Sequence, residues 1–395
     1  MAVIGGSGAT NPPLIPDVLL TVSTTWSPPY KVKALVRCFG GGGSGAVGRN
    51  AVALGKAILA TGGGAGEHAG SILELDPSVT YTVVVGAGGA GRTRASDGGE
   101  VGNAGGNTSF AGSGITTITA NGGAAGLTSE TGSSGTATTQ AGAAGGSGGA
   151  GELYRHTGGA GGAITKPAGS NNIADNMFTT GGGAVGLFGT GFAGGLISWV
   201  TTGSNNRQIA TGGGGVNGAG GPVNTDSGSL THLTWGGSSF GPAGNTTTPA
   251  TTPGWGVNSD FVNLTPTDNE WESTFDFWQS GKLLDRVNHT NQQGYYQLSP
   301  PGTGGMGRNN SATAEAAGSG ATLFAGGGAI CGNDTSFPVQ ATNNNYIAMA
   351  GGRLGGGGGA GGIRGTSGGS GSTKSINSGI GGRGGVLIEM LERVT

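Results

Sequence analysis

The sequence predicts a mainly β protein in which glycine-rich extended rods replace an ordinary hydrophobic core. Three observations lead to this fold class. Glycine supplies 95 of the 395 residues, which disfavours helices because each glycine costs about 1 kcal/mol relative to alanine inside a helix. Charged residues make up only 10% of the chain, whereas disordered chains are usually highly charged. Short runs rich in Val, Ile, Thr and Tyr, bounded by Gly, Pro, Asp or Ser, are typical of strands.

The charge and proline content exclude several classes of protein. A formal net charge of −2 from 18 basic and 20 acidic residues does not suit a nucleic-acid binder held by phosphate contacts. Fifteen prolines without a three-residue glycine period exclude collagen. A glycine-rich chain loses the most backbone entropy on folding, so its order must come from dense backbone hydrogen bonding or from association. We therefore expect a homo-oligomer, with a trimer favoured.

The N-terminal region predicts an arm followed by a sheet. Residues 1–16 contain glycines and three prolines but no basic region and no long apolar stretch, so we expect a docking arm and no signal peptide. Asp76-Pro77-Ser78 predicts a tight turn between two strands. A last strand at the far C-terminus would close the N-terminal sheet and bring both termini to one side. The predicted strands are Val18–Val22, Lys31–Phe39, Ser71–Leu75, Thr80–Val85, Ile115–Ala120 and Val386–Leu391.

One local signature recurs through the chain at irregular spacing, a small or β-branched residue followed by a glycine run. We interpret it as a strand or turn that leads into an extended rod. The irregular spacing excludes a solenoid of fixed period. The six occurrences are Ala60–Gly64, Ala120–Gly123, Thr179–Gly183, Ala210–Gly214, Phe324–Gly328 and Met349–Gly352.

Glycine rods can satisfy one another's backbone. A polyproline II chain has three residues per turn and no internal hydrogen bonds, so every N–H and C=O needs an outside partner. Without Cβ atoms, parallel and antiparallel rods can approach closely enough to supply those partners. The runs 181–195 and 355–371 are long enough to form such rods. We expect a packed polyglycine II-like bundle.

One segment interrupts the glycine pattern. Between Thr265 and Thr290 only Gly281 remains, and Thr267–Glu270 has the spacing of a capping box. The aromatic residues Trp271, Phe275 and Trp278 then recur at helical spacing. We predict a short helix within a non-glycine insert at 260–298, with its aromatic face covering the scaffold.

The residues give no support for catalysis, a cofactor or a metal. The GxGxxG pattern at residues 43–48 follows a strand, but no βαβ series continues it. The four histidines, His68, His156, His232 and His289, lack zinc-site spacing, so we expect polar surface or loop residues. For Cys38 and Cys331 we expect two buried thiols rather than a disulfide. The chain is therefore predicted not to be an enzyme.

Several stretches resemble the glycine-rich domain of bacteriophage tail fibre proteins. The resemblance is specific over about the first 126 residues and the last dozen, and is only compositional between them. It departs from the family at Thr265–Thr290. The stretches that carry it are Thr24–Pro28, Val32–Gly45, Leu73–Gly91, Gly106–Phe110, Ala120–Gly123 and Gly384–Glu389.

The resemblance implies a fold, a location and partners. The fold is a small β-sandwich fused to packed polyglycine rods, and the location is the virion tail after synthesis in the host cytoplasm. On this basis residues 1–16 are the docking arm, which would contact other tail or baseplate proteins. Residues 17–126, with the closing strand 384–395, are the sandwich-like domain, and 127–383 are the rod and loop region. No nucleic acid and no membrane insertion is expected.

The implied function is recognition of a host surface receptor, a glycan or an outer-membrane protein. Loop aromatics flanked by polar residues suit such a role, as in paratope loops, although each could equally pack against a rod or a neighbouring subunit. A purely structural tail or baseplate component is the alternative, and an ice-binding protein and a polysaccharide-degrading enzyme are weaker ones. The candidate receptor-binding residues are Tyr154, Trp199, Trp235, Trp255, Tyr295, Tyr296 and Tyr346.

Overall fold

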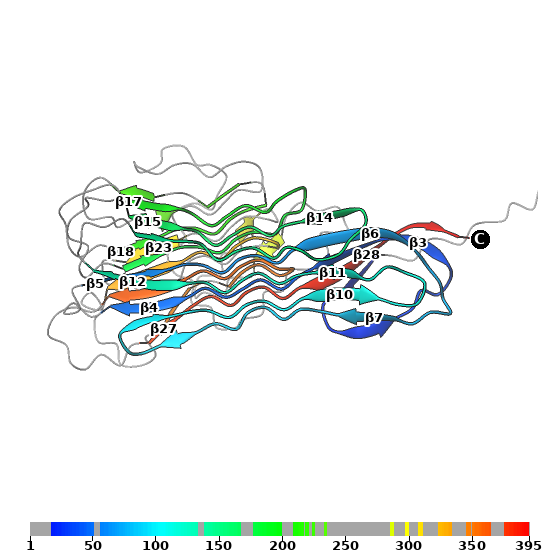
Figure 1. The fold of residues 1–395 in the computed structure, drawn as a ribbon, viewed down its shortest axis with the longest axis horizontal. Helices are drawn as coiled ribbons and strands as arrows, with labels where there is room; N and C mark the ends of the chain where they lie inside the picture. The colour runs from blue at the N-terminus through cyan, green and yellow to red at the C-terminus, as the bar shows by residue number, and fades with distance from the viewer. Residues whose placement is uncertain are drawn as a thin grey trace, which may run out of the picture.

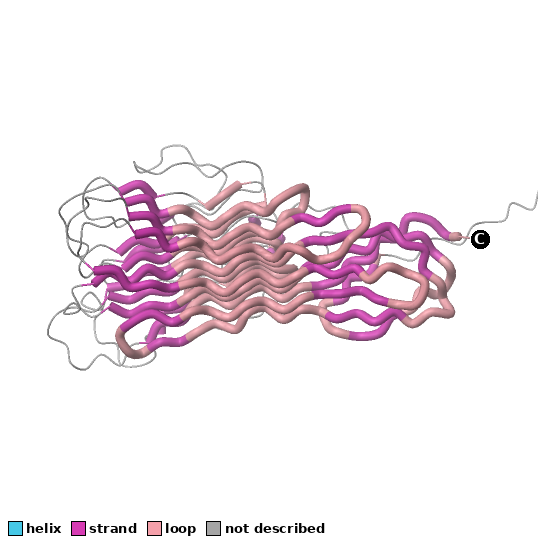
Figure 2. The backbone as a smooth tube through the Cα atoms, viewed as in Figure 1, coloured by secondary structure: helices cyan, strands magenta, loops and turns pink. Residues whose placement is uncertain are grey.

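The protein is elongated, with strands gathered at its two ends and extended segments running between them (Figures 1 and 2). We name the end that holds the C-terminus the terminal end and the opposite end the distal end. In the part of the chain that is described, the fold is mainly β and contains no helix. The computed structural model describes residues 17–50, 56–132, 138–166, 177–199, 208–216, 218–220, 223–225, 233–234, 285–287, 297–299, 307–310, 323–333, 345–348, 350–364 and 375–394.

Two sheets form the terminal end, with strand orders β1-β28-β3-β6-β14 and β11-β10-β7-β2. The last strand, β28, lies between β1 and β3 and pairs antiparallel with both. The first and last strands are therefore neighbours, which confirms the predicted closing strand. The bounds are β1 Val18–Leu20, β2 Thr24–Trp26, β3 Val32–Phe39, β6 His68–Leu75, β7 Tyr81–Val84, β10 Thr108–Ala111, β11 Ile118–Ala120, β14 Tyr154–His156 and β28 Gly385–Arg393.

The two terminal sheets share one hydrophobic core. Alternate residues of β3 are buried because successive side chains of a strand point to opposite faces. Val36 and Ile388 of the five-stranded sheet belong to the same cluster as Tyr81 and Phe110 of the four-stranded sheet. The rings of Tyr81 and Phe110 stack with centroids 5.2 Å apart. The sheets therefore pack face to face.

Short strands form stacked layers at the distal end. Their sheets have the orders β12-β5-β16-β18, β13-β15-β17-β19, β20-β23-β24-β26-β4-β9 and β25-β27-β8, and β21 and β22 pair separately. Apolar clusters join the layers: Leu59 and Ile197 belong to one cluster, Met177 and Cys331 to a second, and Val47 and Ile376 to a third.

The distal strands are mostly three to five residues long. Their bounds are β4 Val47–Asn50, β5 Lys56–Ala60, β8 Thr93–Arg94, β9 Gly98–Glu100, β12 Thr128–Gly132, β13 Thr138–Gln140, β15 Ile164–Lys166, β16 Met177–Thr179, β17 Ile197–Trp199, β18 Gln208–Ala210, β19 Val223–Thr225, β20 Leu233–Thr234, β23 Gly307–Asn310, β24 Ile330–Asn333, β25 Asn345–Ile347, β26 Gly361–Arg364 and β27 Ser375–Asn377. The separate pair is β21 Asp285–Val287 with β22 Gln297–Ser299.

Extended segments, here called glycine rods, connect the two ends. Seven consecutive amides of the rod 40–46 donate to three neighbouring rods in rotation. Each neighbouring rod accepts from every third amide, so there are three residues per turn. The residue number of the acceptor falls by three each time, so the neighbouring rods run antiparallel to the rod 40–46. The donor–acceptor pairs are Gly40–Glu67, Gly43–Gly64 and Ala46–Thr61; Gly41–Gly106 and Ser44–Asn103; Gly42–Gly382 and Gly45–Gly379.

The carbonyl groups of the rod 40–46 accept hydrogen bonds from other neighbouring rods. Gly41 and Ser44 accept from Gly123 and Gly126, and Gly43 accepts from Gly358. Elsewhere the rods run parallel: Thr180 donates to Ala60 and Gly183 to Gly63. The backbone in the middle of the molecule is thus satisfied between rods, as the sequence predicts.

The structure extends or corrects several sequence predictions. The predicted strands occur, and Val79 N donates to Asp76 O at 3.1 Å to close the predicted turn. Four glycine signatures follow directly from strands β5, β11, β16 and β18. The run 181–195 is not one rod, because the chain bends at 187–190, and β26 interrupts the run 355–371. The predicted arm 1–16 and the predicted helix lie outside the described residues.

The division at residue 126 stays a prediction. The later strand β14 pairs with β6 in the terminal sheet.

Candidate functional site

The distal end brings together strand ends from many parts of the chain. The strands that flank residues 51–55, 133–137, 167–176, 200–207, 334–344 and 365–374 all belong to its sheets. In Figure 1, β17, β15, β18, β12 and β4 lie together at this end, far from the C-terminus. Strand ends that are distant in sequence therefore lie together at one end of the molecule.

The chain around β8 and β9, which belong to different sheets, supplies charged residues at the same end. Arg49 pairs with Asp97 at 3.4 Å and Arg92 with Glu100 at 3.5 Å. Lys56 of β5 pairs with Glu130 of β12 at 3.3 Å. These pairs neutralise one another, and partly exposed pairs of this kind contribute little stability. They offer no catalytic arrangement.

The seven predicted receptor-binding aromatics are not brought to one place. Trp199 lies on β17 and Tyr346 on β25, so the backbone puts both at the distal end, on strands rather than loops. Tyr154 lies on β14 at the terminal end, also on a strand. Trp235, Trp255, Tyr295 and Tyr296 lie outside the described residues.

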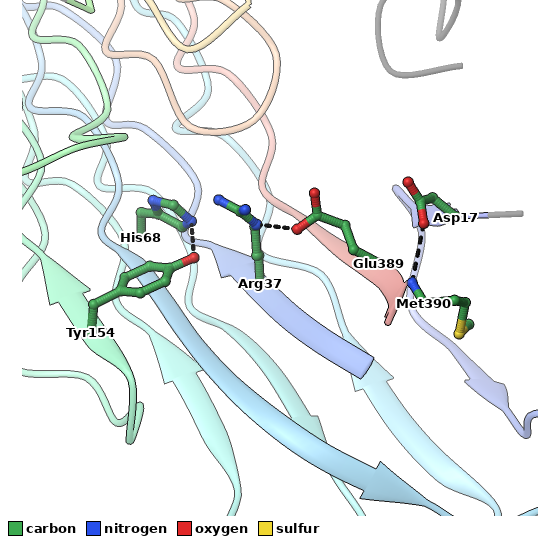
Figure 3. A network of polar contacts seen from close by, with 6 residues as sticks. All are labelled: Asp17, Arg37, His68, Tyr154, Glu389 and Met390. Atoms are coloured by element: carbon green, nitrogen blue, oxygen red, sulfur yellow. Dashed lines mark hydrogen bonds and ion pairs between the residues drawn. The ribbon is translucent and has the colours of Figure 1, made fainter. Parts of the chain in front are cut away.

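Tyr154 belongs to a polar network at the terminal end (Figure 3). Its hydroxyl lies 2.8 Å from His68 Nε2, and the rings of Tyr154 and His156 stack with centroids 4.7 Å apart. Arg37 of β3 forms an ion pair with Glu389 of β28 beside them. At the strand edge, Asp17 Oδ1 accepts from Met390 N at 3.1 Å. The network links β3, β6, β14 and β28.

Burial sets the protonation of this network. Desolvation, the largest cause, lowers the pKa of His68 to about 3. The same effect raises the pKa of Tyr154 to about 12. Both side chains are therefore neutral near pH 7. The prediction of surface or loop histidines is wrong for His68, which is buried on β6, and for His156, which is partly buried on β14. His232 and His289 lie outside the described residues.

A buried carboxylate was missed by the sequence reasoning. Glu67 is 1% exposed, and its Oε2 accepts from Asn121 N at 3.0 Å and Gly149 N at 2.8 Å. At the point where the rod 61–67 continues into β6, this carboxylate accepts from backbone amides, as a backbone carbonyl does elsewhere between the rods. The pair Glu67–His68 follows a glycine run, and no other signal in the sequence marks it.

No metal or cofactor site takes shape in the described part of the chain. Within the described ranges, no three His, Cys, Asp or Glu side chains converge as metal ligands would. Cys38 and Cys331 are both buried and not joined in a disulfide, as predicted. Among the same residues, no helix has the length and apolar character needed to cross a membrane.

Comparison with known proteins identifies a domain type. Residues 20–203, slightly less than half of the 395-residue chain, match a family model described as a glycine-rich domain. No curated protein matches the chain. The matched region begins with the terminal sheets and reaches β17 at the distal end. The chain thus contains a region similar to a glycine-rich domain, and that description names no activity or ligand.

Proposed function

We propose that the protein is a bacteriophage tail fibre or tail-tip protein that recognises a host surface receptor without chemistry. The observation that carries this proposal is the gathering of the short strands at the distal end, opposite the neighbouring strands β1 and β28. An adhesin needs this polarity, because one end must attach to the particle while the other meets the cell. In this proposal the terminal end and the arm 1–16 join other tail proteins.

A stiff scaffold supports the proposal. We infer that the glycine rods form a polyglycine II-like bundle, because hydrogen bonds return to the same neighbour every three residues. We also infer that the terminal sheets form a small β-sandwich, because they share one apolar core. A bundle fixed by backbone bonds holds its end surface in place whatever residues the connections carry. It therefore suits a protein whose recognition segments vary.

The amino-acid composition of three segments that connect distal strands favours an uncharged ligand. The segments 167–176, 200–207 and 334–344 are rich in Asn, Ser and Thr and contain few charges. Such residues supply directional hydrogen bonds to sugar hydroxyls or to a protein backbone, and aromatic rings add rigid contact area. Trp199 directly precedes one of these segments and Tyr346 follows another. We propose a surface glycan or an outer-membrane protein as receptor, bound by a homo-oligomer of this chain.

Binding to cells tests the proposal. The purified, fluorescently labelled protein is applied to a panel of bacterial strains beside phage adsorption. Staining that is strain-specific and competes with the phage is expected. Trp199→Ala or Tyr346→Ala should reduce staining with an unchanged circular dichroism spectrum, whereas Tyr154→Phe, at the other end, should not. A folded protein that stains no strain would instead support a structural tail or baseplate component.

A further inference from the structure

Three segments of the chain meet at one carbonyl at the terminal end. The oxygen of Gly186, just before the bend at 187–190, lies 3.1 Å from His68 Nδ1 and 3.2 Å from His156 Nδ1. A carbonyl only accepts hydrogen bonds, so both Nδ1 atoms carry hydrogen. Two imidazoles, one from β6 and one from β14, therefore hold the bend against the sheet.

The second nitrogen of His68 fixes its charge. With hydrogen on Nδ1, a neutral ring has a lone pair on Nε2, which accepts the hydroxyl proton of Tyr154 across 2.8 Å (Figure 3). A protonated His68 would aim a donor at the Tyr154 oxygen, and the phenol proton would lose its acceptor on Nε2. The network fits only the neutral imidazole.

The surrounding charges oppose a positive His68. Arg37 of β3 and His156 of β14 face it, and both disfavour a second positive charge. Glu389 of β28 is engaged by Arg37, and the neighbouring Glu67 is held by two backbone amides. Arg155 of β14 is exposed and donates to Gly149 O at 3.2 Å. No described carboxylate is therefore left to compensate a proton on His68.

We propose that His68, Tyr154 and His156 form an acid-sensitive latch. In the neutral state they tie β14 and the 187–190 bend to β6. Mild acid raises the population of a locally open state, in which His68 is exposed and takes up a proton, while the glycine rods stay folded. The rods are joined mainly by hydrogen bonds between backbone groups, which do not titrate.

Proton linkage gives the direction and size of the effect. Burial lowers the pKa of His68 to about 3, whereas an exposed histidine has a pKa of about 6.5. The closed latch is therefore fully favoured above pH 6.5 and is lost progressively as the pH falls toward 3. One such histidine raises the opening equilibrium about 25-fold between pH 7 and pH 5.

Amide hydrogen exchange measures the opening. Leu153 N donates to Gly70 O at 3.0 Å beside β14, and Gly191 N donates to Thr157 O at 2.8 Å beside the bend. After correction for intrinsic exchange, both amides should lose protection about 25-fold from pH 7 to pH 5. The rod amides of Gly43 and Gly64 serve as the internal control and should stay far more protected than Leu153 and Gly191 at both pH values. Equal protection of Leu153 and Gly191 at both pH values would overturn the latch.

His68→Gln provides the matched variant. Its carboxamide can donate to Gly186 and accept from Tyr154 but cannot titrate, so the pH effect should disappear. A His68→Gln protein that keeps the full effect would remove His68 from the proposal. If the latch of the variant is already open at pH 7, nitrogen-15 NMR of the histidines in the wild-type protein tests the proposal instead. His68 should remain the neutral Nδ1–H tautomer down to pH 4. A titration midpoint of His68 near pH 6.5 would contradict the latch.

Discussion

A Cβ atom on Gly63 would lie 2.1 Å from the carbonyl oxygen of Gly43. The two residues belong to neighbouring rods, and no side chain separates their backbones. Real Cβ atoms do not approach an oxygen this closely, so glycine at position 63 is a packing requirement. Because the contact is backbone, it cannot be relieved by rotating a side chain.

Gly63→Ala is therefore expected to destabilise the protein by about 3 kcal/mol or more, the upper range for overpacking a rigid core. Gly189 is the control, since nothing lies within 4 Å of a Cβ built there. Gly189→Ala should leave stability unchanged or raise it by about 0.5 kcal/mol through the unfolded chain. Guanidinium unfolding of both variants measures the difference, and equal midpoints would contradict tight rod packing.

The hydroxyl of Thr180 connects two other rods. Its Oγ1 accepts from Gly62 N at 3.1 Å and donates to Gly162 O at 2.7 Å, and the residue is fully buried. Thr180→Val keeps the shape but leaves a buried amide unsatisfied, so a loss of about 1–3 kcal/mol is expected. Thr180→Ser should recover most of it. The exposed Thr82→Val should be neutral, and a Thr180→Val protein of wild-type stability would exclude a structural role for the bridge.

The last strand contributes to the core as well as to hydrogen bonding. Ile388 is fully buried between the terminal sheets, whereas Leu391 on the same strand is 46% exposed. Ile388→Ala should cost about 2–5 kcal/mol, and Leu391→Ala should cost much less. Thermal and denaturant unfolding compare the two. Similar small losses would mean that the inner strand β28 contributes little to the core of the terminal sheets.

The longer strands were predictable because their pattern is local. Lys31–Phe39 and Val386–Leu391 were expected, and the structure has Val32–Phe39 and Gly385–Arg393. Alternation over eight residues identifies a strand. Three-residue strands such as Tyr154–His156 and Met177–Thr179 carry no period to detect. They form because the rod that adjoins each of them places its backbone beside another strand, with which it then pairs.

The candidate sites depended on contacts distant in sequence. The sequence predicts a surface or loop position for His68, because the four histidines lack the spacing of a zinc site. Its burial comes from Tyr154, 86 residues away, and from Gly186, 118 residues away. The gathering of the short strands at the distal end likewise follows from the direction of every rod. By contrast, composition alone predicts the glycine rods. A glycine-rich chain has few side chains to bury, so its backbone N–H and C=O groups must find partners on neighbouring segments.

Both thiols should be inert in the folded protein. Cys38 and Cys331 are fully buried, and burial raises the pKa of the Cys38 thiol far above its usual range. A thiol must ionise and be accessible in order to react. Ellman's reagent should therefore label neither cysteine in buffer and both in guanidinium, with no disulfide on a non-reducing gel. Thr25→Cys, which puts a thiol on an exposed strand position, should add one rapidly reacting equivalent and shows that the reagent has access. Rapid labelling of the unmodified chain would mean that the core of the terminal sheets around Cys38, or the distal layers around Cys331, open readily in solution.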